Sequence, residues 1–173
     1  MTDAPSPAQN GPTKLGPATA YMIAVGVILA DQASKRYVLE GLHLEKLGRV
    51  EWFGPLQLTM VWNRGVSFGL FRADQDLMRW VLAAFSAIVA ILLIVWARKQ
   101  SRGLTLTALG LVIGGAIGNL IDRVRFGAVA DFIDVSALYF PWVFNVADAG
   151  ITIGVILLLI DSARGDRLAK PAP

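Results

Sequence analysis

The stretch LMRWVLAAFSAIVAILLIVWA, residues 77–97, determines the fold class of this chain. About 20 consecutive apolar residues are enough for a helix to cross the hydrocarbon layer of a membrane, which is roughly 30 Å thick. The stretch contains a single charged residue, Arg79, and carries Trp80 and Trp96 near its two ends, where indole rings favour the boundary between lipid and water. It therefore predicts a transmembrane helix.

Three further apolar runs accompany it, at residues 19–38, 104–121 and 142–160. Of the 173 residues, 55% are hydrophobic and 17% are charged, whereas soluble domains are about 45 to 50% apolar. We therefore expect an all-α membrane protein, a four-transmembrane-helix bundle that forms a single domain over residues 19–163. Residues 1–18 are rich in Pro, Ala and Gly and predict a disordered N-terminal tail, and residues 164–173 form a C-terminal tail.

Residues 39–76 form the largest segment between the predicted spans. Within them, Leu56, Leu58, Met60 and Trp62 alternate with the residues between them, and a period of two predicts a strand. Turn residues stand on both sides of this stretch, at 54–55 and 63–65. We expect a small β-containing, extracytoplasmic segment between the first two helices, lying on the membrane surface.

Several classes of site are excluded by composition. The chain has no cysteine, so it has no disulfide, thiolate metal site or cysteine nucleophile, and its one histidine, His43, is predicted to be a surface loop residue. No metal or cofactor is expected. The net charge is +3, but the basic residues lie at helix ends and in loops without interleaved aromatics, so no nucleic acid partner is expected.

Basic residues also indicate the orientation. The short loop after the second span contains Arg98, Lys99 and Arg102, and further Lys and Arg residues follow the fourth span. Short loops rich in Lys and Arg favour the cytoplasmic side. The opposite side carries more basic residues in total, but several stand beside polar residues of the candidate site. We therefore expect both termini to be cytoplasmic.

Ionisable residues in a span cost about 2.5 to 3.5 kcal/mol on insertion scales, which makes them candidates for function. Asp31 and Lys35 are four residues apart and share a helix face, where they either orient the helix end as an ion pair or contact a ligand. Asn119 and Asp122 also share a face and either cap backbone groups or bind Arg123, or belong to a site. For each of these two pairs, both interpretations stay open.

In the third span, ahead of Asn119, glycines at 110, 114 and 118 predict close packing of another helix.

Asp148 is predicted to lie roughly 9 Å inside the fourth span at 1.5 Å per residue, too deep for a loop carboxylate. Its expected partner is Asn145, the Asn119 group or an aspartate of the preceding loop, and spacing does not choose between Asp131 and Asp134. Two neighbouring aspartates share one proton and can act as base and acid in the hydrolysis of a peptide bond. A structural Asp148 held by Arg123 is the alternative. A serine mechanism is weaker, because Ser34 is adjacent to Lys35 and so points away from it on a helix, and Ser67 has no histidine or lysine nearby in sequence.

Five motifs together resemble a known family. They are DQASK at 31–35, NRGVSFG at 63–69, GGAIGNLIDR at 114–123, VADF at 129–132 and FNVADAGI at 144–151. In this order, they are similar to the bacterial lipoprotein signal peptidases (signal peptidase II), an aspartic peptidase family. Each motif is weak alone, and the set is highly specific.

The resemblance implies that Asp131 and Asp148 form the catalytic dyad. It implies supporting or substrate-binding roles for eight further residues: Asp31, Lys35, Asn63, Gly65, Asn119, Asp122, Arg123 and Asn145. The implied reaction removes signal peptides from diacylglyceryl-modified prolipoproteins by cleavage before the lipidated cysteine, at the outer face of the bacterial cytoplasmic (inner) membrane. Membrane lipid and the inhibitor globomycin are expected ligands, and a monomer is expected.

Two expectations concern function more widely. The segment 39–76 is expected to close over the substrate, because Gly65 and Gly69 flank Phe68 there. The alternative function is a small four-helix proton-coupled transporter with Asp122 and Asp148 as proton-linked groups. Its size would require a dimer, and it would have little use for the long insertion. A non-catalytic scaffold would leave Asp148 unexplained.

Overall fold

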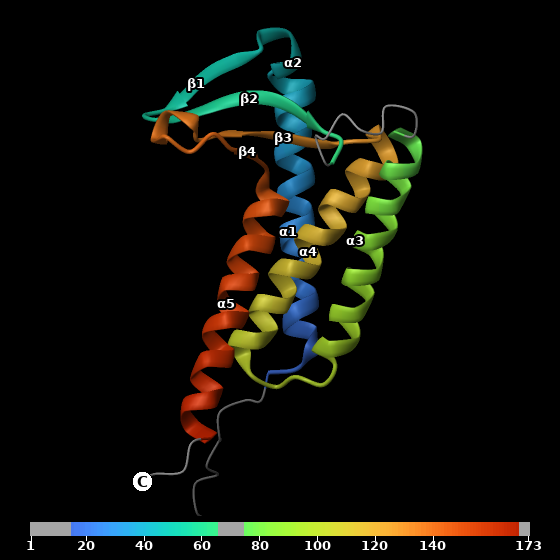
Figure 1. The fold of residues 1–173 in the computed structure, drawn as a ribbon, viewed down its shortest axis with the longest axis vertical. Coiled ribbons are helices and arrows are strands. Elements are labelled where there is room, and N and C mark those ends of the chain that lie inside the picture. The colour runs from blue at the N-terminus through green and yellow to red at the C-terminus, as the bar shows by residue number, and fades with distance from the viewer. Residues whose placement is uncertain (1–14, 66–74, 170–173) are drawn as a thin grey trace, which may run out of the picture.

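The computed structural model describes residues 15–65 and 75–169. Within them, four long helices run alternately up and down: α1 (Pro17–Arg36), α3 (Gln75–Ala97), α4 (Gly103–Phe126) and α5 (Val146–Ala169). Figure 1 shows the helices along the long axis of the molecule, with a small sheet across one end. The start of α1 and the end of α5 lie at the other end. Most of the predicted N-terminal tail, residues 170–173 and the motif residues Ser67, Phe68 and Gly69 lie outside the described residues. The predicted start of the C-terminal tail at residue 164 is wrong, because α5 continues to Ala169.

Three of these helices are long and apolar enough to cross a membrane: Asp76–Ala97, Gly103–Phe126 and Val146–Arg164. The first helix, α1, is not among them, because its last turns contain Asp31, Lys35 and other polar residues. Large apolar side chains such as Phe85 and Leu92 on α3 and Leu159 on α5 are exposed. A row of exposed apolar side chains indicates contact with lipid or another apolar partner. The chain is thus a mostly helical protein with apolar helices suited to a membrane.

Helix α4 is the centre of the bundle and packs against α1, α3 and α5. Its glycines make this possible. A Cβ atom on Gly114 would lie 2.7 Å from the carbonyl oxygen of Ala24 on α1, and a Cβ on Gly115 would collide with the carbonyl oxygen of Ala147 on α5. Side chains at these positions would push the helices apart. The predicted glycine face is confirmed and serves both neighbours.

The sheet has four antiparallel strands in the order β1 (Arg49–Phe53), β2 (Leu56–Asn63), β3 (Val129–Asp134) and β4 (Val143–Phe144). The hairpin of β1 and β2 confirms the prediction from the period of two. The prediction of a loop after the third span is wrong, because β3 pairs with both β2 and β4. Nearly every residue of β3 is buried, so its sequence lacks the alternation that would reveal a strand.

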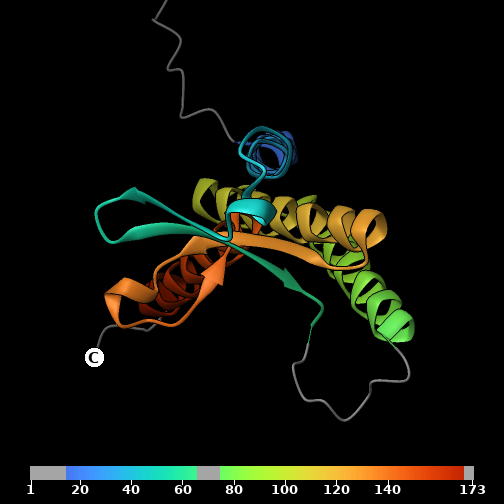
Figure 2. The same ribbon diagram turned by 90° about the horizontal axis from the view of Figure 1, so that it is seen from above.

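A second hydrophobic core joins the sheet to the end of α1. A π-helical turn, η1 (Tyr37–Gly41), and the short helix α2 (Leu44–Leu47) continue the chain from α1 to β1. The buried core residues are Val38, Leu44, Leu58 and Phe132. Figure 2 shows α2 over the sheet and the β1–β2 hairpin projecting beyond the helices. Residue His43 precedes α2 as an exposed loop residue, as predicted.

The helix ends near the predicted site differ from the expected ones. Helix α4 continues to Phe126, past the predicted end at residue 121, so Asp122 and Arg123 are helical. Helix α5 begins at Val146 instead of residue 142, because β4 occupies the residues before it. The expected depth of Asp148 is therefore wrong: Asp148 lies in the first turn of α5, near the sheet.

Candidate active site

Asp131 lies in β3 and is only 2% exposed. Two amides from other elements donate to its carboxyl group: Asn145 Nδ2 to Oδ1 at 2.6 Å and Asn63 Nδ2 to Oδ2 at 3.1 Å. Burial raises the pKa of Asp131 to about 6, and the negative charge of Asp148 adds to the rise. The amides and Lys35 oppose it in part. The carboxyl group of Asp131 therefore holds a proton more tightly than an aspartate in water does.

Asp148 lies in the first turn of α5 and is half-buried. Its Oδ1 accepts a hydrogen bond of 2.7 Å from Asn119 Nδ2 on α4. Its backbone N–H donates at 2.9 Å to Oδ1 of Asn145, which caps the start of the helix. The N-terminal end of a helix carries partial positive charge, which stabilises a negative group in the first turn. Asp148 is thus well placed as a carboxylate.

The side chain of Asn145 connects the two aspartates. It is fully buried. Its Nδ2 donates to Asp131 and also to Asn119 Oδ1 at 3.3 Å, while its Oδ1 accepts from the Asp148 backbone. The side-chain amide of Asn145 therefore binds both Asp131 of β3 and Asp148 of α5, the two residues with the candidate carboxyl groups. The structure brings together the two aspartates that the resemblance named.

Asn63 is held by the backbone beside it. The N–H of Gly65 donates to Asn63 Oδ1 at 3.0 Å, which leaves Nδ2 to donate to Asp131. Gly65 has a φ of 97°, a conformation that favours glycine, and a Cβ there would lie 2.5 Å from Leu82 Cδ1 on α3. A glycine is therefore needed for the end of β2 to reach the site.

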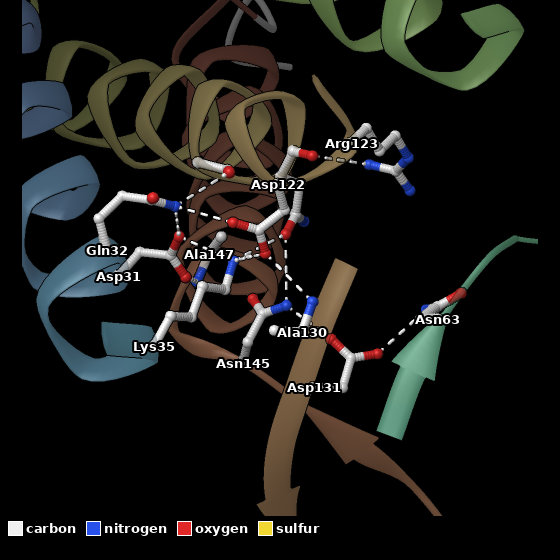
Figure 3. Close-up of polar contacts among 12 residues, drawn as sticks. Asp31, Gln32, Lys35, Asn63, Asp122, Arg123, Ala130, Asp131, Asn145 and Ala147 are labelled. Atoms are coloured by element: carbon white, nitrogen blue, oxygen red, sulfur yellow. Dashed lines mark hydrogen bonds and ion pairs between the residues drawn. The ribbon is translucent and has the colours of Figure 1, made fainter. Parts of the chain in front are cut away.

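A buried ionic cluster lies between α1 and α4 beside the aspartates. Lys35 Nζ is 2.8 Å from Asp31 Oδ2 and 2.8 Å from Asp122 Oδ2. Sequence analysis predicted the pair of Asp31 and Lys35 but missed Gln32, whose Nε2 donates to Asp122 Oδ1 at 3.0 Å and to Asp31 Oδ2 at 3.1 Å. Its position inside the DQASK motif was the available signal. Figure 3 shows the cluster.

Arg123 is adjacent to the site, where its charge interacts with that of Asp148. Its Nη1 donates to the backbone oxygen of Asn119 at 3.3 Å, and among the described residues its contacts include no direct ion pair with Asp148. A structural Asp148 held by Arg123 stays a prediction. Another arginine has a role that the sequence did not suggest: Arg79 of α3 donates to the carbonyl oxygens of Arg123 and Val124 at 2.7 and 2.6 Å, and so caps the last turn of α4.

The other aspartate of β3, Asp134, belongs to a separate cluster. Its Oδ2 accepts from Thr59 Oγ1 at 2.6 Å and from Arg49 Nη2 at 2.7 Å, and its Oδ1 accepts from the backbone N–H of Ser136 at 2.8 Å. Hydrogen bonds from Ser136 and Thr59 hold the pKa of Asp134 well below its ordinary value. Residues 131 and 134 face opposite sides of the strand, so only Asp131 lies beside α5.

Serine chemistry has no support at the described serine of the DQASK motif. The hydroxyl of Ser34 donates to the backbone oxygen of Asp31 at 2.8 Å within its own helix. No base is placed to activate it. Ser67 lies outside the described residues.

The chain matches known proteins over most of its length. The family described as Signal peptidase (SPase) II matches residues 23–164. A lipoprotein signal peptidase of Caulobacter vibrioides is 56% identical over 144 residues, which are 83% of this chain and 85% of the relative. One from Methylobacterium sp. (strain 4-46) is 42% identical and covers 92% of this chain and 98% of the relative.

Two solved structures have a similar fold. A bacterial membrane enzyme superimposes with a TM-score of 0.75 at 30% identity, covering 90% of this chain and 94% of that one. A second, at 31% identity, has a TM-score of 0.72 and covers 90% of this chain and 95% of that one. With most of its length matched by sequence and by fold, the chain belongs to the signal peptidase II family.

Proposed function

We propose that this chain is an intramembrane aspartic endopeptidase that removes signal peptides from diacylglyceryl-modified prolipoproteins, cleaving before the lipidated cysteine. The observation that carries the proposal is the shared amide of Asn145, which binds the carboxyl group of Asp131 and the backbone of Asp148. Family membership supports the substrate class. A transporter is not favoured, because the matched relatives are peptidases.

In the proposed mechanism, the reaction starts from the form of the enzyme in which Asp131 carries the shared proton and Asp148 is ionised. Burial and the nearby charge raise the pKa of Asp131 to about 6, so that Asp131 takes up this proton at a higher pH than an aspartate in water does. Asp148 takes a proton from a water molecule as the water oxygen attacks the scissile carbonyl carbon, and Asp131 donates its proton to the carbonyl oxygen. When the C–N bond breaks, the proton on Asp148 passes to the leaving nitrogen and a hydroxyl proton of the intermediate returns to Asp131.

We propose that α1 is the fourth transmembrane helix. Its polar residues Asp31 and Lys35 are buried against the rest of the bundle, whereas Met22, Val25 and Leu29 are exposed. The outward surface of α1 is therefore apolar, even though its average composition is not. Charged groups inside a bundle that pair with one another are compatible with a membrane span.

The orientation follows from the ends of the bundle. The loop with Arg98 and Lys99 joins α3 to α4 at the end away from the sheet, where α1 begins and α5 ends (Figure 1). We propose that this end is cytoplasmic and that the sheet and the aspartates lie near the outer face of the inner membrane. A lipid-modified cysteine would meet the site there. We further propose that the enzyme is a monomer and that it binds globomycin.

Cleavage of a diacylglyceryl-modified prolipoprotein by the purified protein in detergent tests the function. Asp131→Asn and Asp148→Asn should each lower kcat by at least about 100-fold, the lower range for a positioned acid or base. Asp134→Asn is the matched control, since it removes a carboxyl group from the same strand on the opposite face. Full turnover by either folded dyad variant would remove that aspartate from the mechanism, and absence of cleavage by the parent would contradict the substrate.

A further inference from the structure

The two buried carboxylates beside the site bind the backbone at corresponding positions. Asp31 Oδ1 accepts the N–H of Ala147 at 3.0 Å, and Asp122 Oδ2 accepts the N–H of Ala130 at 3.1 Å. Ala147 directly precedes Asp148, and Ala130 directly precedes Asp131. Each aspartate of the dyad is therefore tethered, one peptide unit away, to a carboxylate that is itself fully buried. Figure 3 shows both backbone contacts.

Lys35 joins these two tethers. Its ammonium group lies 2.8 Å from a carboxylate oxygen of Asp31 and 2.8 Å from one of Asp122, and its side chain is 3% exposed. Gln32 donates to the same two carboxylates. We call Asp31, Lys35 and Asp122 the Lys35 clamp. Because charge-assisted hydrogen bonds in a dry site are strong and directional, the clamp sets the distance between the two tethered peptide units.

Gly118 of α4 lies so close to the clamp that a side chain at this position would contact Asp31. A Cβ on Gly118 would lie 2.7 Å from Asp31 Oδ2 and 3.2 Å from the Cβ of Ala147. Any larger residue would therefore displace the carboxylate that holds the N–H beside Asp148. Asp31 and Lys35 are buried and paired with each other, which supports the ion-pair interpretation of the two that the sequence left open.

The clamp also orients an amide of the site. Lys35 Nζ donates to Asn119 Oδ1 at 3.4 Å, and Asn145 donates to the same oxygen. With its oxygen facing two donors, the Asn119 amide presents Nδ2 to Asp148, at 2.7 Å. Loss of the ammonium would weaken the preference for this orientation. The clamp thus acts on Asp148 through both its backbone and its side-chain partner.

We propose that Asp31, Lys35 and Asp122 are positioning residues that set the separation of the two catalytic carboxyl groups without touching the substrate. The inference rests on the proposed function, since it takes Asp131 and Asp148 as the dyad. It predicts that disturbing the clamp lowers kcat while KM stays near the parent value. Misplacement of reacting groups by 1 Å costs on the order of 100-fold in rate.

The test uses variants that leave the net charge of the clamp unchanged. Lys35→Met alone would leave two unpaired buried carboxylates, which can prevent folding. The double variant Lys35→Met/Asp122→Asn removes one positive and one negative charge, and the asparagine oxygen can still accept the N–H of Ala130. Gly118→Ala disturbs the clamp without any change of charge. Asp161→Asn is the control: Asp161 accepts from Thr105 Oγ1 at 2.6 Å between α5 and α4, away from the clamp.

Turnover and melting temperature are measured for each variant with the diacylglyceryl-modified prolipoprotein. The proposal expects kcat to fall by about 100-fold in the folded double variant and about tenfold in Gly118→Ala, with KM within about threefold of the parent. A kcat within about threefold of the parent in the folded double variant overturns it, as does an equal fall in Asp161→Asn. If the double variant does not fold, Gly118→Ala decides by the same criteria.

Failure of the clamp and failure of the proposed function give different results. If Asp131→Asn and Asp148→Asn lose turnover while the clamp variants keep it, the dyad stands and the clamp proposal is wrong. If an Asp131 or Asp148 variant keeps full turnover, the proposed function is wrong whatever the clamp variants do.

Discussion

Replacing Asp131 with asparagine should make the protein more stable at pH 8 while it removes the proposed acid. The pKa of the buried Asp131 is raised from 3.8 to about 6, mainly by burial and then by the charge of Asp148. Above pH 6 the folded protein must hold an ionised carboxyl group in a place that disfavours the charge. At about 1.4 kcal/mol for each pH unit between the two values, this costs the ionised protein about 3 kcal/mol.

The sign follows from proton binding. With a raised pKa, the folded state binds the proton more tightly than the unfolded state, so this group stabilises the fold most below pH 3.8 and the benefit is lost as the pH rises through 6. Asparagine stays neutral throughout and avoids the loss. It also replaces an acceptor of Asn63 with an NH₂ group, which costs about 1 kcal/mol at every pH.

The net effect of Asp131→Asn is therefore a gain of about 2 kcal/mol at pH 8 and almost no gain, or a small loss, at pH 4. For a chain of this size, each kcal/mol shifts Tm by roughly 2–4 °C. Melting of the parent and the variant in the same detergent, followed by fluorescence of the five tryptophans, should give a variant Tm higher by about 4–8 °C at pH 8. An equal difference at pH 4 and pH 8 would refute the reasoning, because a buried, titrating carboxyl group is its only pH-dependent part.

Two further predictions concern stability. Asp134→Asn should have the opposite pH dependence: the pKa of Asp134 is lowered by hydrogen bonds from Ser136 and Thr59, so its stabilisation is present above the ordinary pKa of 3.8 and lost as the pH falls below it. The variant should lose about 1–3 kcal/mol at pH 8, and a Tm deficit that does not shrink toward pH 3 would contradict this. Gly114→Val should cost about 1–3 kcal/mol by separating α1 from α4, whereas Gly26→Ala, where a Cβ meets nothing within 4 Å, should leave Tm nearly unchanged; similar melting of the two would rule out the close contact.

Features that depend on near neighbours in the chain were accessible from the sequence. Apolar runs predicted the apolar helices, since the length needed to cross a membrane is a property of a continuous segment. The alternation within Leu56–Asn63 predicted a strand, and the spacing of Asp31 and Lys35 placed both residues on one helix face, where the structure shows their ion pair. The glycine spacing on α4 predicted close helix contacts. The last three of these predictions use only the repeat of side-chain directions within one helix or one strand.

Features that depend on pairing between distant segments needed the tertiary structure. Strand β3 is buried on both faces, so its residues show no alternation, and its place between β2 and β4 could not be found from spacing. That pairing turns Asp131 toward α5 and Asp134 toward Thr59 and Arg49, a choice that the spacing of three residues left open. The pairing of β4 with β3 also sets the start of α5, because β4 includes the residues directly before Asn145.

The sequence by itself therefore determined the apolar helices and the strand at residues 56–63, and by resemblance it predicted the dyad residues. The tertiary structure alone decided how the carboxyl groups are held. The amides of Asn63, Asn119 and Asn145 come from β2, α4 and the start of α5, and the clamp carboxylates reach backbone groups up to 116 positions away in the chain. A hydrogen bond requires heavy atoms within about 3 Å in a defined direction, and between distant segments only the packing of helices against the sheet supplies that geometry.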